Sequence, residues 1–519
     1  MKRGYFTISI LLAALITGGA MAQEQPNELR QKAAKLQKDG NFKEAFEIYR
    51  QLLDKAREST DPQSSRDLYS ARDCLQQLNR ISEIDALIED VVAAHPKDPA
   101  LLDTAANLYF TLPHHGYIIA GEFRRGEHRG GGQYADCTER DRVRAIQLFL
   151  QAHENQPDKV VRARTLLNLA AAISMGRQGN NAWRFQTLTN LDKLPEQEPG
   201  NRWHRGGRNP RGAPVTTDGK ALLYQIPASW EAARNDGERW RYAITEVARL
   251  DPTFRDHCLL TWADFLHAQF GVKTMAQFGW FRSMDMDDQK GILQLHTLTD
   301  EETVARLANG VRRFKLPAGF NFMSIYRELS KRNEHAADKL IQIYLDRRQH
   351  VKAANLLEEA ITRFPISSLL KNRKNLLSQI TGNWGRFNAT SNAFPAGTEP
   401  ELVFTYRNAE EVTIIAHEVD INGMVDDLWQ YIERNPLKLD YNLYHFHSLG
   451  RDLVNGERKK YVGKEVGRRT HTLKPRANHW DTNASVTVPV SKAGTYLVSA
   501  KLENGVTTHT VVWIDGISL

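Results

Sequence analysis

The last quarter of the chain alternates apolar and polar positions in the way that β-strands do. The alternating segments are residues 402–406, 496–502 and 506–514. In each of them, successive side chains of an extended backbone fall on opposite faces. A Glu-Asn-Gly turn at 503–505 joins the last two segments as a predicted β-hairpin. The pattern therefore predicts a C-terminal β-sandwich over residues 383–519.

A helical pattern interrupts these strands. Within 424–461 the apolar residues recur at helical spacing, first in Met424, Leu428, Tyr431 and Ile432. We therefore expect the sandwich to carry a helical insertion over this range. The last strand ends on the apolar run 511–514. We expect its Trp513 to pack inward against this insertion or against the end of the upstream helices.

Upstream, over residues 23–379, one helical spacing recurs. Small and large apolar residues follow one another at intervals of four and three, and a proline follows the two later copies at the same offset. The copies are Ala45, Tyr49 and Leu52; Ala145, Phe149, Ala152 and Pro157; and Ala353, Leu357, Ala360 and Pro365. Alanine lets two helices approach, the larger side chains fill the groove between them, and proline stops the helix.

This spacing resembles the second helix of a tetratricopeptide repeat (TPR). We therefore expect residues 23–379 to form a TPR-like α-solenoid, whose concave surface would bind a partner protein. The predicted fold class is mainly α with a C-terminal β domain.

Two insertions rich in glycine and arginine interrupt this region, at 114–134 and 200–214. We interpret both as long surface loops, whose arginines pair with carboxylates such as Glu122 and Glu127. Contact with nucleic acid and an anion cradle of glycine amides are the alternatives, although the glycine spacing fits no phosphate-loop pattern. The candidate partner-contact residues of these loops are Arg124, Arg125, Arg129, Trp203, Arg205 and Arg208.

The N-terminus has the pattern of a signal peptide. Lys2 and Arg3 precede an apolar run at 5–16, and Ala20-Met21-Ala22 then supplies the small residues that a signal peptidase reads. We expect residues 1–22 to be removed by cleavage after Ala22, which makes the mature protein periplasmic or secreted. The apolar run is short for a membrane span, so no span is predicted.

Composition and charge narrow the possible partners. The chain has 519 residues, of which 41% are hydrophobic and 25% charged, as in ordinary globular proteins. The formal net charge of +7 falls by two when the leader is removed, and this mild excess disfavours a nucleic-acid binder. Cys74, Cys137 and Cys258 have no spacing that shows whether two of them pair.

One acidic cluster resembles a calcium-binding loop. It contains Asp285, Asp287 and Asp288, but Gly291 falls one position late and the bidentate glutamate is missing. We interpret the cluster as a solvated acidic loop.

Other candidate chemistry also lacks the required spacing. His445 and His447 match no metal-ligand pattern, and the acidic residues 300–302 are expected to open a helix. The chain has no nucleophile elbow, phosphate loop or paired acid and base. We therefore predict no catalytic residue, no metal site and no cofactor, and expect a protein that is not an enzyme.

A set of short motifs, most of them in the last quarter, occurs together in this chain. They are residues 404–409, 412–419, 460–463, 473–476, His479, 493–498 and 511–513, with 121–132 and 236–241 in the helical part. Together they resemble bacterial alpha-2-macroglobulin-like proteins, where a helical repeat region leads into the first macroglobulin-type β-sandwich. The resemblance implies a macroglobulin-type sandwich after the TPR-like α-solenoid.

Members of that family are large exported proteins thought to trap or inhibit proteases in the cell envelope, many through a Cys-Gly-Glu-Gln thioester. None of the three cysteines begins such a quartet, and no bait region is present. The chain also stops at Leu519, where relatives continue through further sandwiches. The resemblance therefore implies the N-terminal portion of such a protein, within a protease-inhibitor system.

The leading hypothesis is an exported, non-enzymatic protein-interaction module. Its partner would be a protease or another envelope protein, and not nucleic acid. One alternative is a stand-alone TPR-like scaffold. The other is an envelope hydrolase, in which the arginines of 114–134 and 200–214 hold an anionic substrate opposite a carboxylate or histidine.

Overall fold

The chain forms two compact units in the computed structural model. Unit 1 comprises Met1–Asn209 and Tyr224–Cys258, and unit 2 comprises Pro210–Leu223 and Leu259–Leu519. The structure describes residues 25–55, 61–177, 179–200, 212–278, 291–388, 393–436, 438, 453–454, 456–503 and 507–516. The predicted leader lies outside these residues. The unit boundary falls inside the helical region, and not where the C-terminal strands begin.

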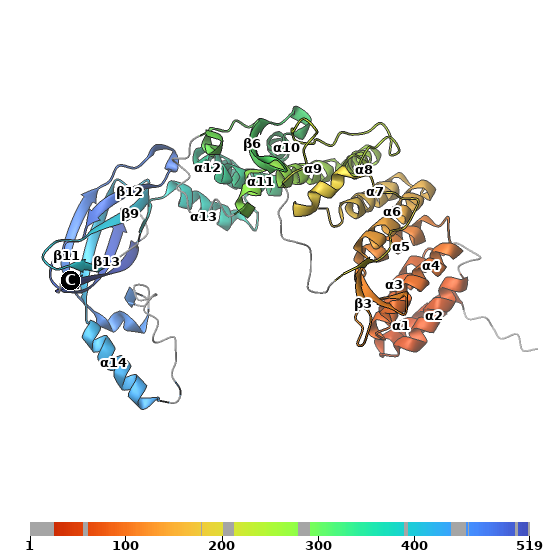
Figure 1. The fold of residues 1–519 in the computed structure, drawn as a ribbon, viewed down its shortest axis with the longest axis horizontal. Coiled ribbons are helices and arrows are strands. Elements are labelled where there is room, and N and C mark those ends of the chain that lie inside the picture. The colour runs from red at the N-terminus through yellow and green to blue at the C-terminus, as the bar shows by residue number, and fades with distance from the viewer. Residues whose placement is uncertain are drawn as a thin grey trace, which may run out of the picture. The chain divides into compact units, whose positions relative to one another are not determined.

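Helices follow one another along most of the chain (Figure 1). In unit 1 they are α1 (Pro26–Lys38), α2 (Phe42–Lys55), α3 (Ser64–Gln77), α4 (Ile84–Ala94), α5 (Pro99–Thr111), α6 (Thr138–Asn155), α7 (Lys159–Ser174) and α8 (Asp236–Leu250). Helix α9 (Arg255–Phe270) crosses the unit boundary. Unit 2 adds α10 (Phe322–Leu329), α11 (Glu334–Asp346), α12 (His350–Arg363) and α13 (Leu370–Thr381).

The turns of the pairs α1–α2 and α11–α12 share one geometry. Gly40 and Arg348 follow α1 and α11 with φ of 83° and 57°, in the left-handed region. The next amide in each turn donates to the helix carbonyl five residues earlier, at 2.8 Å, which completes a Schellman motif. Five residues after each turn residue, Ala45 and Ala353 are fully buried. The chain thus contains TPR-like helical hairpins.

The repeated side chains lie on the packed faces of α2, α6 and α12. Those buried are Ala45, Tyr49, Leu52, Ala145, Phe149, Ala152, Ala353, Leu357 and Ala360. Pro157 and Pro365 each stand two residues beyond the end of their helix. Proline lacks the amide that would continue the helix, which accounts for both ends.

The first glycine-rich insertion is a sheet, so the predicted surface loop is wrong there. Its strands are β1 (His115–Ile119), β2 (Glu122–Arg125), β3 (Gln133–Asp136) and the short β4 (Glu198–Pro199), in the order β2-β1-β3-β4. The backbone polar groups of the insertion pair across these strands instead of facing water. A Cβ added at Gly116 would lie 2.2 Å from the carbonyl oxygen of Arg124, so glycine permits this close pairing.

A second departure from the predicted helices lies in unit 2. Strands β5 (Glu302–Leu307) and β6 (Gly310–Lys315) form an antiparallel hairpin. The expectation that residues 300–302 open a helix is therefore wrong. Thr303, Val304 and Ala305 are buried in β5, and the β-branched Thr303 and Val304 fit a strand better than a first helical turn.

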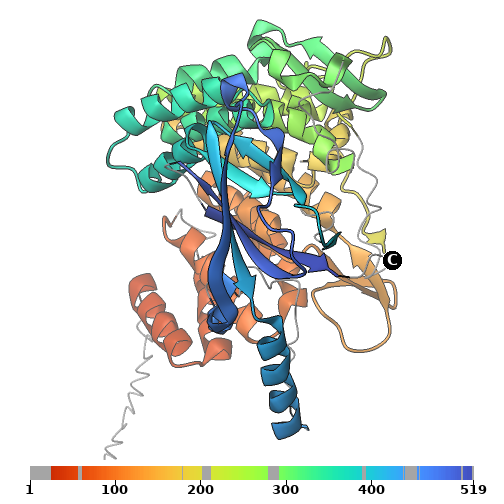
Figure 2. The same ribbon diagram turned by 90° about the vertical axis from the view of Figure 1, so that its left-hand side faces the viewer.

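The C-terminal strands form two sheets around one core (Figure 2). The strands are β7 (Trp384–Phe387), β8 (Ala393–Pro395), β9 (Glu401–Arg407), β10 (Glu411–Val419), β11 (Val462–Thr472), β12 (Thr482–Thr487), β13 (Gly494–Leu502) and β14 (Thr507–Asp515). One sheet has the order β11-β10-β13-β14-β8 and the other β12-β9-β7. Alternate residues such as Phe404, Val412 and Val498 are fully buried between them. The predicted antiparallel pairing of the last two strands is confirmed.

Helix α14 (Ile421–Arg434) is the described part of the predicted helical insertion. It extends away from the strands in both ribbon views (Figures 1 and 2). Its Met424 joins Leu453 and Leu497 in a small cluster, against which Trp513 packs half-buried. Trp513 thus packs against a cluster that the insertion shares with the strands, on the outer face of the five-stranded sheet. Residues 439–452 of the insertion lie outside the described residues.

Within the described part of the chain, no helix is long and apolar enough to cross a membrane.

Candidate functional site

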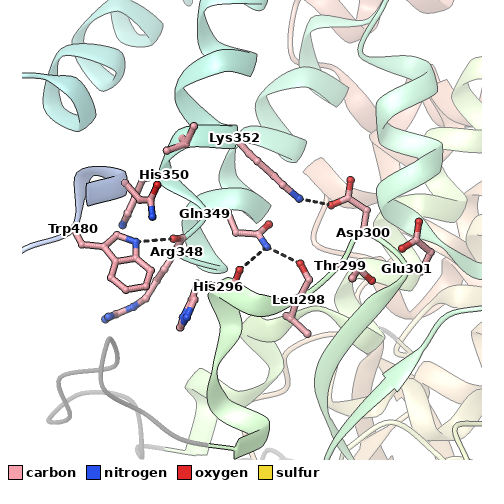
Figure 3. Close-up of a pocket in the computed structure, with 12 residues that line it drawn as sticks. His296, Leu298, Thr299, Asp300, Glu301, Arg348, Gln349, His350, Lys352 and Trp480 are labelled. Carbon is pink, nitrogen blue, oxygen red and sulfur yellow. Dashed lines mark hydrogen bonds and ion pairs between the residues drawn. The ribbon is translucent and has the colours of Figure 1, made fainter. Parts of the chain in front are cut away.

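A pocket of about 730 Å³ lies in unit 2, where the α11–α12 turn and a turn of the sandwich come together. Its walls come from three separate stretches of sequence, 296–301, 348–352 and 478–480. Figure 3 shows Trp480, Arg348 and His296 along one side and Thr299, Asp300 and Glu301 along the other. A volume of this size lies within the range of about 300–1,000 Å³ that is usual for ligand pockets.

Trp480 forms the aromatic wall. Its indole meets the His296 ring edge to face, with the ring centroids 4.6 Å apart. The indole N–H donates to the Arg348 carbonyl at 3.4 Å, so the left-handed turn that ends α11 also positions the tryptophan. The guanidinium of Arg476 lies 4.7 Å from the centre of the Trp480 ring. A cation at this distance from an indole face is attracted by its quadrupole.

Gln349 fixes the floor of the pocket. Its side-chain amide donates to the carbonyls of His296 and Leu298, at 3.2 and 2.7 Å, and the side chain is only 9% exposed. Although Gln349 is the N-cap residue of α12, its side chain does not cap that helix. The bonds tie the 3₁₀ turn Leu295–Thr297 to the helical hairpin.

Asp300 stands on the opposite wall within a set of donors. Lys352 donates to it at 3.1 Å, and Arg327 and the Tyr344 hydroxyl also donate to it. Burial would raise the pKa of Asp300, but the bonds from Arg327 and Lys352 outweigh it and lower that pKa. The carboxylate is therefore ionised and its charge is offset by cations.

Arg347 lies behind the wall, with no exposed surface. Its guanidinium donates to the carbonyls of Thr299 and Glu302, at 3.1 and 2.9 Å. Burial lowers its pKa to about 10, which leaves it charged at neutral pH. The charges of Asp300 and Glu302 act in the opposite direction on the pKa of Arg347, but burial outweighs them.

The sandwich is fixed beside this pocket by a second cluster of bonds. The Asn408 side chain donates to the carbonyls of Ile380 and Gly382, at 2.9 and 3.0 Å, at the end of α13. His479 Nδ1 lies 2.9 Å from the side-chain oxygen of Asn408. Arg407 bonds Asp481 at 2.7 Å and donates to the Gln379 carbonyl at 3.1 Å. The turn that carries Trp480 is thus held to the end of α13 from both sides, through Asn408 and Arg407.

The predicted partner-contact residues fall into three groups. Arg124 and Arg129 are exposed on the inserted sheet. Trp203, Arg205 and Arg208 lie outside the described residues. The third group is Arg125 alone, whose side chain is only 2% exposed, so the prediction that it contacts a partner is corrected.

Arg125 is buried because it joins the inserted sheet to the helices. It donates to both carboxylate oxygens of Asp141 on α6 and to Asp85 on α4. Its pKa is raised, because the bonds to Asp141 and Asp85 outweigh burial, which alone would lower it. His114 Nδ1 also lies 2.8 Å from Asp141. A buried arginine needs such partners, and the sequence alone does not show which carboxylates supply them.

The end of the first insertion lies next to the start of the second. The Gly200 amide donates to the Tyr134 carbonyl at 2.9 Å, and β3 pairs with β4 just before it. The rings of Tyr134, His115 and Tyr117 lie near one another on this sheet, with centroids 5.8 to 6.0 Å apart for the contacting pairs. The hydrolase alternative requires the insertions to be neighbours, but its residues Arg205 and Arg208 lie outside the described part, so it stays a prediction.

The three cysteines are buried free thiols. Burial raises the pKa of the Cys74 and Cys258 thiols to about 11. Burial also raises the pKa of Cys137, whose sulfur lies between Arg125 and Asp141. Thiols with raised pKa values are poor nucleophiles and poor metal ligands at neutral pH.

A metal site has no support among the described residues, which contain no group of three or more histidine, cysteine, aspartate or glutamate side chains placed to hold an ion. Asp285, Asp287, Asp288, His445 and His447 lie outside the part that the structure describes.

The chain matches no protein-family model and no curated protein sequence. A tetratricopeptide repeat protein from Parabacteroides merdae aligns over 68% of this chain and 98% of its own, at 9% identity and a TM-score of 0.19. Residues 1–338 of Acl4, an assembly chaperone of RpL4, align over 69% of this chain and 98% of theirs, at 14% identity and a TM-score of 0.23. Similarities at this level assign no family to the chain.

Proposed function

We propose that the chain is an exported, non-enzymatic protein-interaction module of the bacterial alpha-2-macroglobulin-like type. In this proposal the helical hairpins bind a protein partner in the cell envelope, and the sandwich docks against a partner or a further domain. The module would belong to a protease-inhibitor system, without a bait region or thioester of its own.

One observation carries the proposal. The motifs behind the family resemblance include residues 404–409, 473–476 and His479, and several of their side chains meet at the junction between α13 and the sandwich. The Tyr406 hydroxyl also accepts from the Lys474 amide, at 2.8 Å, within the sandwich. Because these motifs form the junction, they favour a protein in which the helices and the sandwich are held in a fixed geometry for binding.

The helical part supports the same proposal independently of the resemblance. Consecutive helices of unit 1 pack pairwise, as α1 with α2, α2 with α3, α5 with α6, α6 with α7 and α7 with α8. Arrays of this kind present extended surfaces and bury a shared core between neighbours. Their usual ligands are other polypeptides, which favours a binding module over a pocket enzyme.

The test is capture of a partner by the full chain, expressed in its native host with its own leader and mildly cross-linked in the envelope. We expect a processed periplasmic or secreted protein that captures a defined partner. An Arg124→Glu/Arg129→Glu variant should reduce that capture if the inserted sheet takes part. Arg249→Glu is the matched control, because the Arg249 side chain is 67% exposed at a site with no predicted contact.

Two results would contradict the proposal in different ways. A chain that keeps its leader and stays inside the cell would contradict the proposal that the protein is exported. The protein could instead be processed and run as a single monodisperse species, with nothing cross-linked to it. That result would contradict the proposal that it binds a partner protein.

A further inference from the structure

We infer that helices α3, α5 and α7 together bind a basic side chain, an arginine or lysine of a protein partner, at Asp103. Helix α5 carries Asp103 and packs against both α3 and α7. This inference rests on the proposed function, because it names the chemistry of one contact that the helical hairpins would make with their partner. It arises from the charge of Asp103, from the polar side chains around it and from the exposed ring of Tyr69.

Asp103 is a partly exposed carboxylate without a counter-ion. Among the described residues no lysine or arginine forms an ion pair with it. Its Oδ2 accepts from the Asn107 side chain at 2.8 Å, whereas its Oδ1 is buried without a hydrogen-bond partner. Burial raises the pKa of Asp103, and the uncharged side chains of α5 and α7 that lower this pKa do not outweigh burial. A poorly compensated charge of this kind is costly, so a cation from a ligand would stabilise it.

The side chains beside Asp103 offer oxygen atoms to a ligand. Asn107 lies one turn further along α5, and its Nδ2 donates to the Asp103 carbonyl and to the carboxylate, each at 2.8 Å. Asn168 on α7 also donates to this carboxylate. Because each amide directs its nitrogen at Asp103, its oxygen is the atom left to accept from a ligand. Both asparagines are partly exposed. A carboxylate among amide oxygens requires a ligand that donates hydrogen bonds, and a cation fits it best.

Tyr69 on α3 adds an aromatic surface to this site. Burial raises the pKa of its hydroxyl, and the negative charge of Asp103 raises it further, because the ring lies near the carboxylate. The Tyr69 side chain remains 36% exposed. The guanidinium of Arg72 lies 5.9 Å from the ring centre, and its own charge is offset by Asp73, at 3.3 Å. An arginine or lysine of a partner can therefore lie against the exposed part of the ring while its charge meets Asp103.

A purely structural role for Asp103 explains less of this arrangement. If Asp103 only joined α5 to α7, an asparagine would fill the same position without a charge that burial disfavours. The whole chain has a formal net charge of +7, so its overall field does not attract basic segments. Binding of a basic ligand would therefore report a local site and not a general attraction.

The experiment is selection of a displayed library of random 12-residue peptides on the immobilised full chain. Peptides that bind an immobilised Asp103→Asn variant are removed first. We expect the peptides selected afterwards to share an arginine or lysine. A synthetic peptide from the selection, labelled with fluorescein, then serves as the probe for affinity measurements by fluorescence anisotropy. Its affinity should fall with added salt, as for a contact between charges.

Variants of the chain locate the contact. Asp103→Asn should weaken the labelled peptide about tenfold or more, because it removes the charge and keeps the size of the side chain. Tyr69→Ala should weaken it, and Tyr69→Phe, which keeps the ring, should weaken it less. Asp90→Asn makes the same charge change at an exposed position on α4, so it should leave the affinity unchanged.

A change in the peptide tests the pairing directly. Replacing its shared basic residue by glutamine should lose about as much affinity as Asp103→Asn does. Combining the two changes should cost little more than either alone, as for two groups in direct contact. Losses that add in full would show that the basic residue binds elsewhere.

Far-ultraviolet circular dichroism and the urea midpoint of each variant separate binding from folding. Because Asp103→Asn removes a buried charge, its midpoint should equal or exceed that of the parent. A variant that unfolds more readily and still binds the peptide as tightly as the parent would leave Asp103 a structural role only. That result would overturn the inference.

Other results would overturn it too. These are a library that yields no binder after the first removal, selected peptides without basic residues, or an effect of Asp90→Asn as large as that of Asp103→Asn. If Asp103→Asn and Tyr69→Ala still capture the envelope partner fully, the inference fails while the proposed function stands. If basic peptides bind at Asp103 but no envelope partner is captured, the site stands and the proposed function fails.

Discussion

The guanidinium of Arg125 donates to both carboxylate oxygens of Asp141, at 2.6 and 2.8 Å, where both side chains are almost fully buried. The same guanidinium reaches Asp85 at 2.7 Å. One arginine of the inserted sheet therefore joins that sheet to α4 and α6. The insertion is a fixed part of unit 1 because of these bonds.

The first prediction concerns this arginine. Arg125→Ala should lower the free energy of unfolding by about 3–5 kcal/mol, because it leaves the Asp141 carboxylate buried without its main partner. Urea unfolding followed by circular dichroism measures the change. Arg124→Ala is the control, since the Arg124 side chain is 56% exposed, and it should change the value by less than about 0.5 kcal/mol. Equal midpoints for the two variants would show that the pair contributes no net stability.

The second prediction is a loss of stability in acid that depends on Glu139. Burial would raise the pKa of this carboxyl, but the bond from Arg177 and the charge of Arg142 lower it to about 2, from an ordinary value of 4.5. The unfolded chain therefore binds the proton more readily than the folded one. Stability is complete above about pH 4.5 and falls as the pH drops toward 2.

Hydrogen exchange of α6 and α7 between pH 5 and 2.5 tests this dependence on Glu139. The total effect is at most about 3 kcal/mol, at 1.36 kcal/mol for each pKa unit. Glu139→Gln should flatten the dependence. Glu122→Gln, at a carboxylate that is 79% exposed, should leave it unchanged. If the protection of both variants changes with pH as steeply as that of the parent, the effect does not come from Glu139.

The third prediction concerns a buried histidine of unit 2. Burial, with Lys339 and Lys273 nearby, lowers the pKa of His267 to about 4 from 6.5. The His267 ring packs against Phe322, with the centroids 5.3 Å apart. Because the folded state disfavours the protonated ring, the stability present above about pH 6.5 is lost as the pH falls toward 4.

Protection of α9 and α10 from hydrogen exchange should therefore decline between pH 7 and 4.5. His267→Gln should remove most of this decline, and His335→Gln, at an exposed position on α11, should not. If the protection of His267→Gln declines as much as that of the parent, groups other than His267 cause the decline.

Local patterns were enough to predict the sandwich and the helical hairpins. The alternation of apolar and polar residues in β9 and β13 shows which side chains face the core. Phe404 and Val498 could therefore be assigned to the core from the sequence. The Ala45 and Ala353 spacing works in the same way, because close helix packing selects small side chains at fixed intervals.

The two small sheets of the helical region could not be predicted in this way. Their strands have only two to six residues, too few for a clear period in a glycine-rich or charged stretch. A usable signal existed for β5–β6, since Asn309-Gly310 is a dipeptide typical of hairpin turns. The pocket left no local signal, because His296, Arg348 and Trp480 are far apart in sequence and meet only through the fold.

The fourth prediction revises the expectation for Trp513. This side chain is half-buried on the outer face of the five-stranded sheet, against the cluster that contains Met424, Leu453 and Leu497. Trp513→Ala should therefore lower the free energy of unfolding by about 1–3 kcal/mol, below the range of about 3–5 kcal/mol for a fully buried aromatic. Trp513→Phe, which keeps part of the contact, should lower it less. An unchanged urea midpoint for Trp513→Ala would mean that α14 does not depend on this contact.

The last prediction concerns the junction between α13 and the sandwich. Asn408 has φ of 60°, and its side-chain amide holds the carbonyls of Ile380 and Gly382. Asn408→Gly keeps the backbone conformation available and removes only the side-chain bonds. We expect it to weaken the hold of α13 on the sandwich, and limited proteolysis should then cut near Gly382 several times faster.

Asn478→Gly is the matched control for this junction. Asn478 has a similar φ of 64° in the same region of unit 2, and it contributes to the pocket wall. The substitution relieves a left-handed backbone without removing the bonds of Asn408, so cleavage near Gly382 should stay at the rate of the parent. If Asn408→Gly is also cut at the parent rate, then Arg407 and its bond to the Gln379 carbonyl are sufficient to hold the sandwich. In that case the position of Trp480 beside Arg348 depends on the Trp480 turn itself.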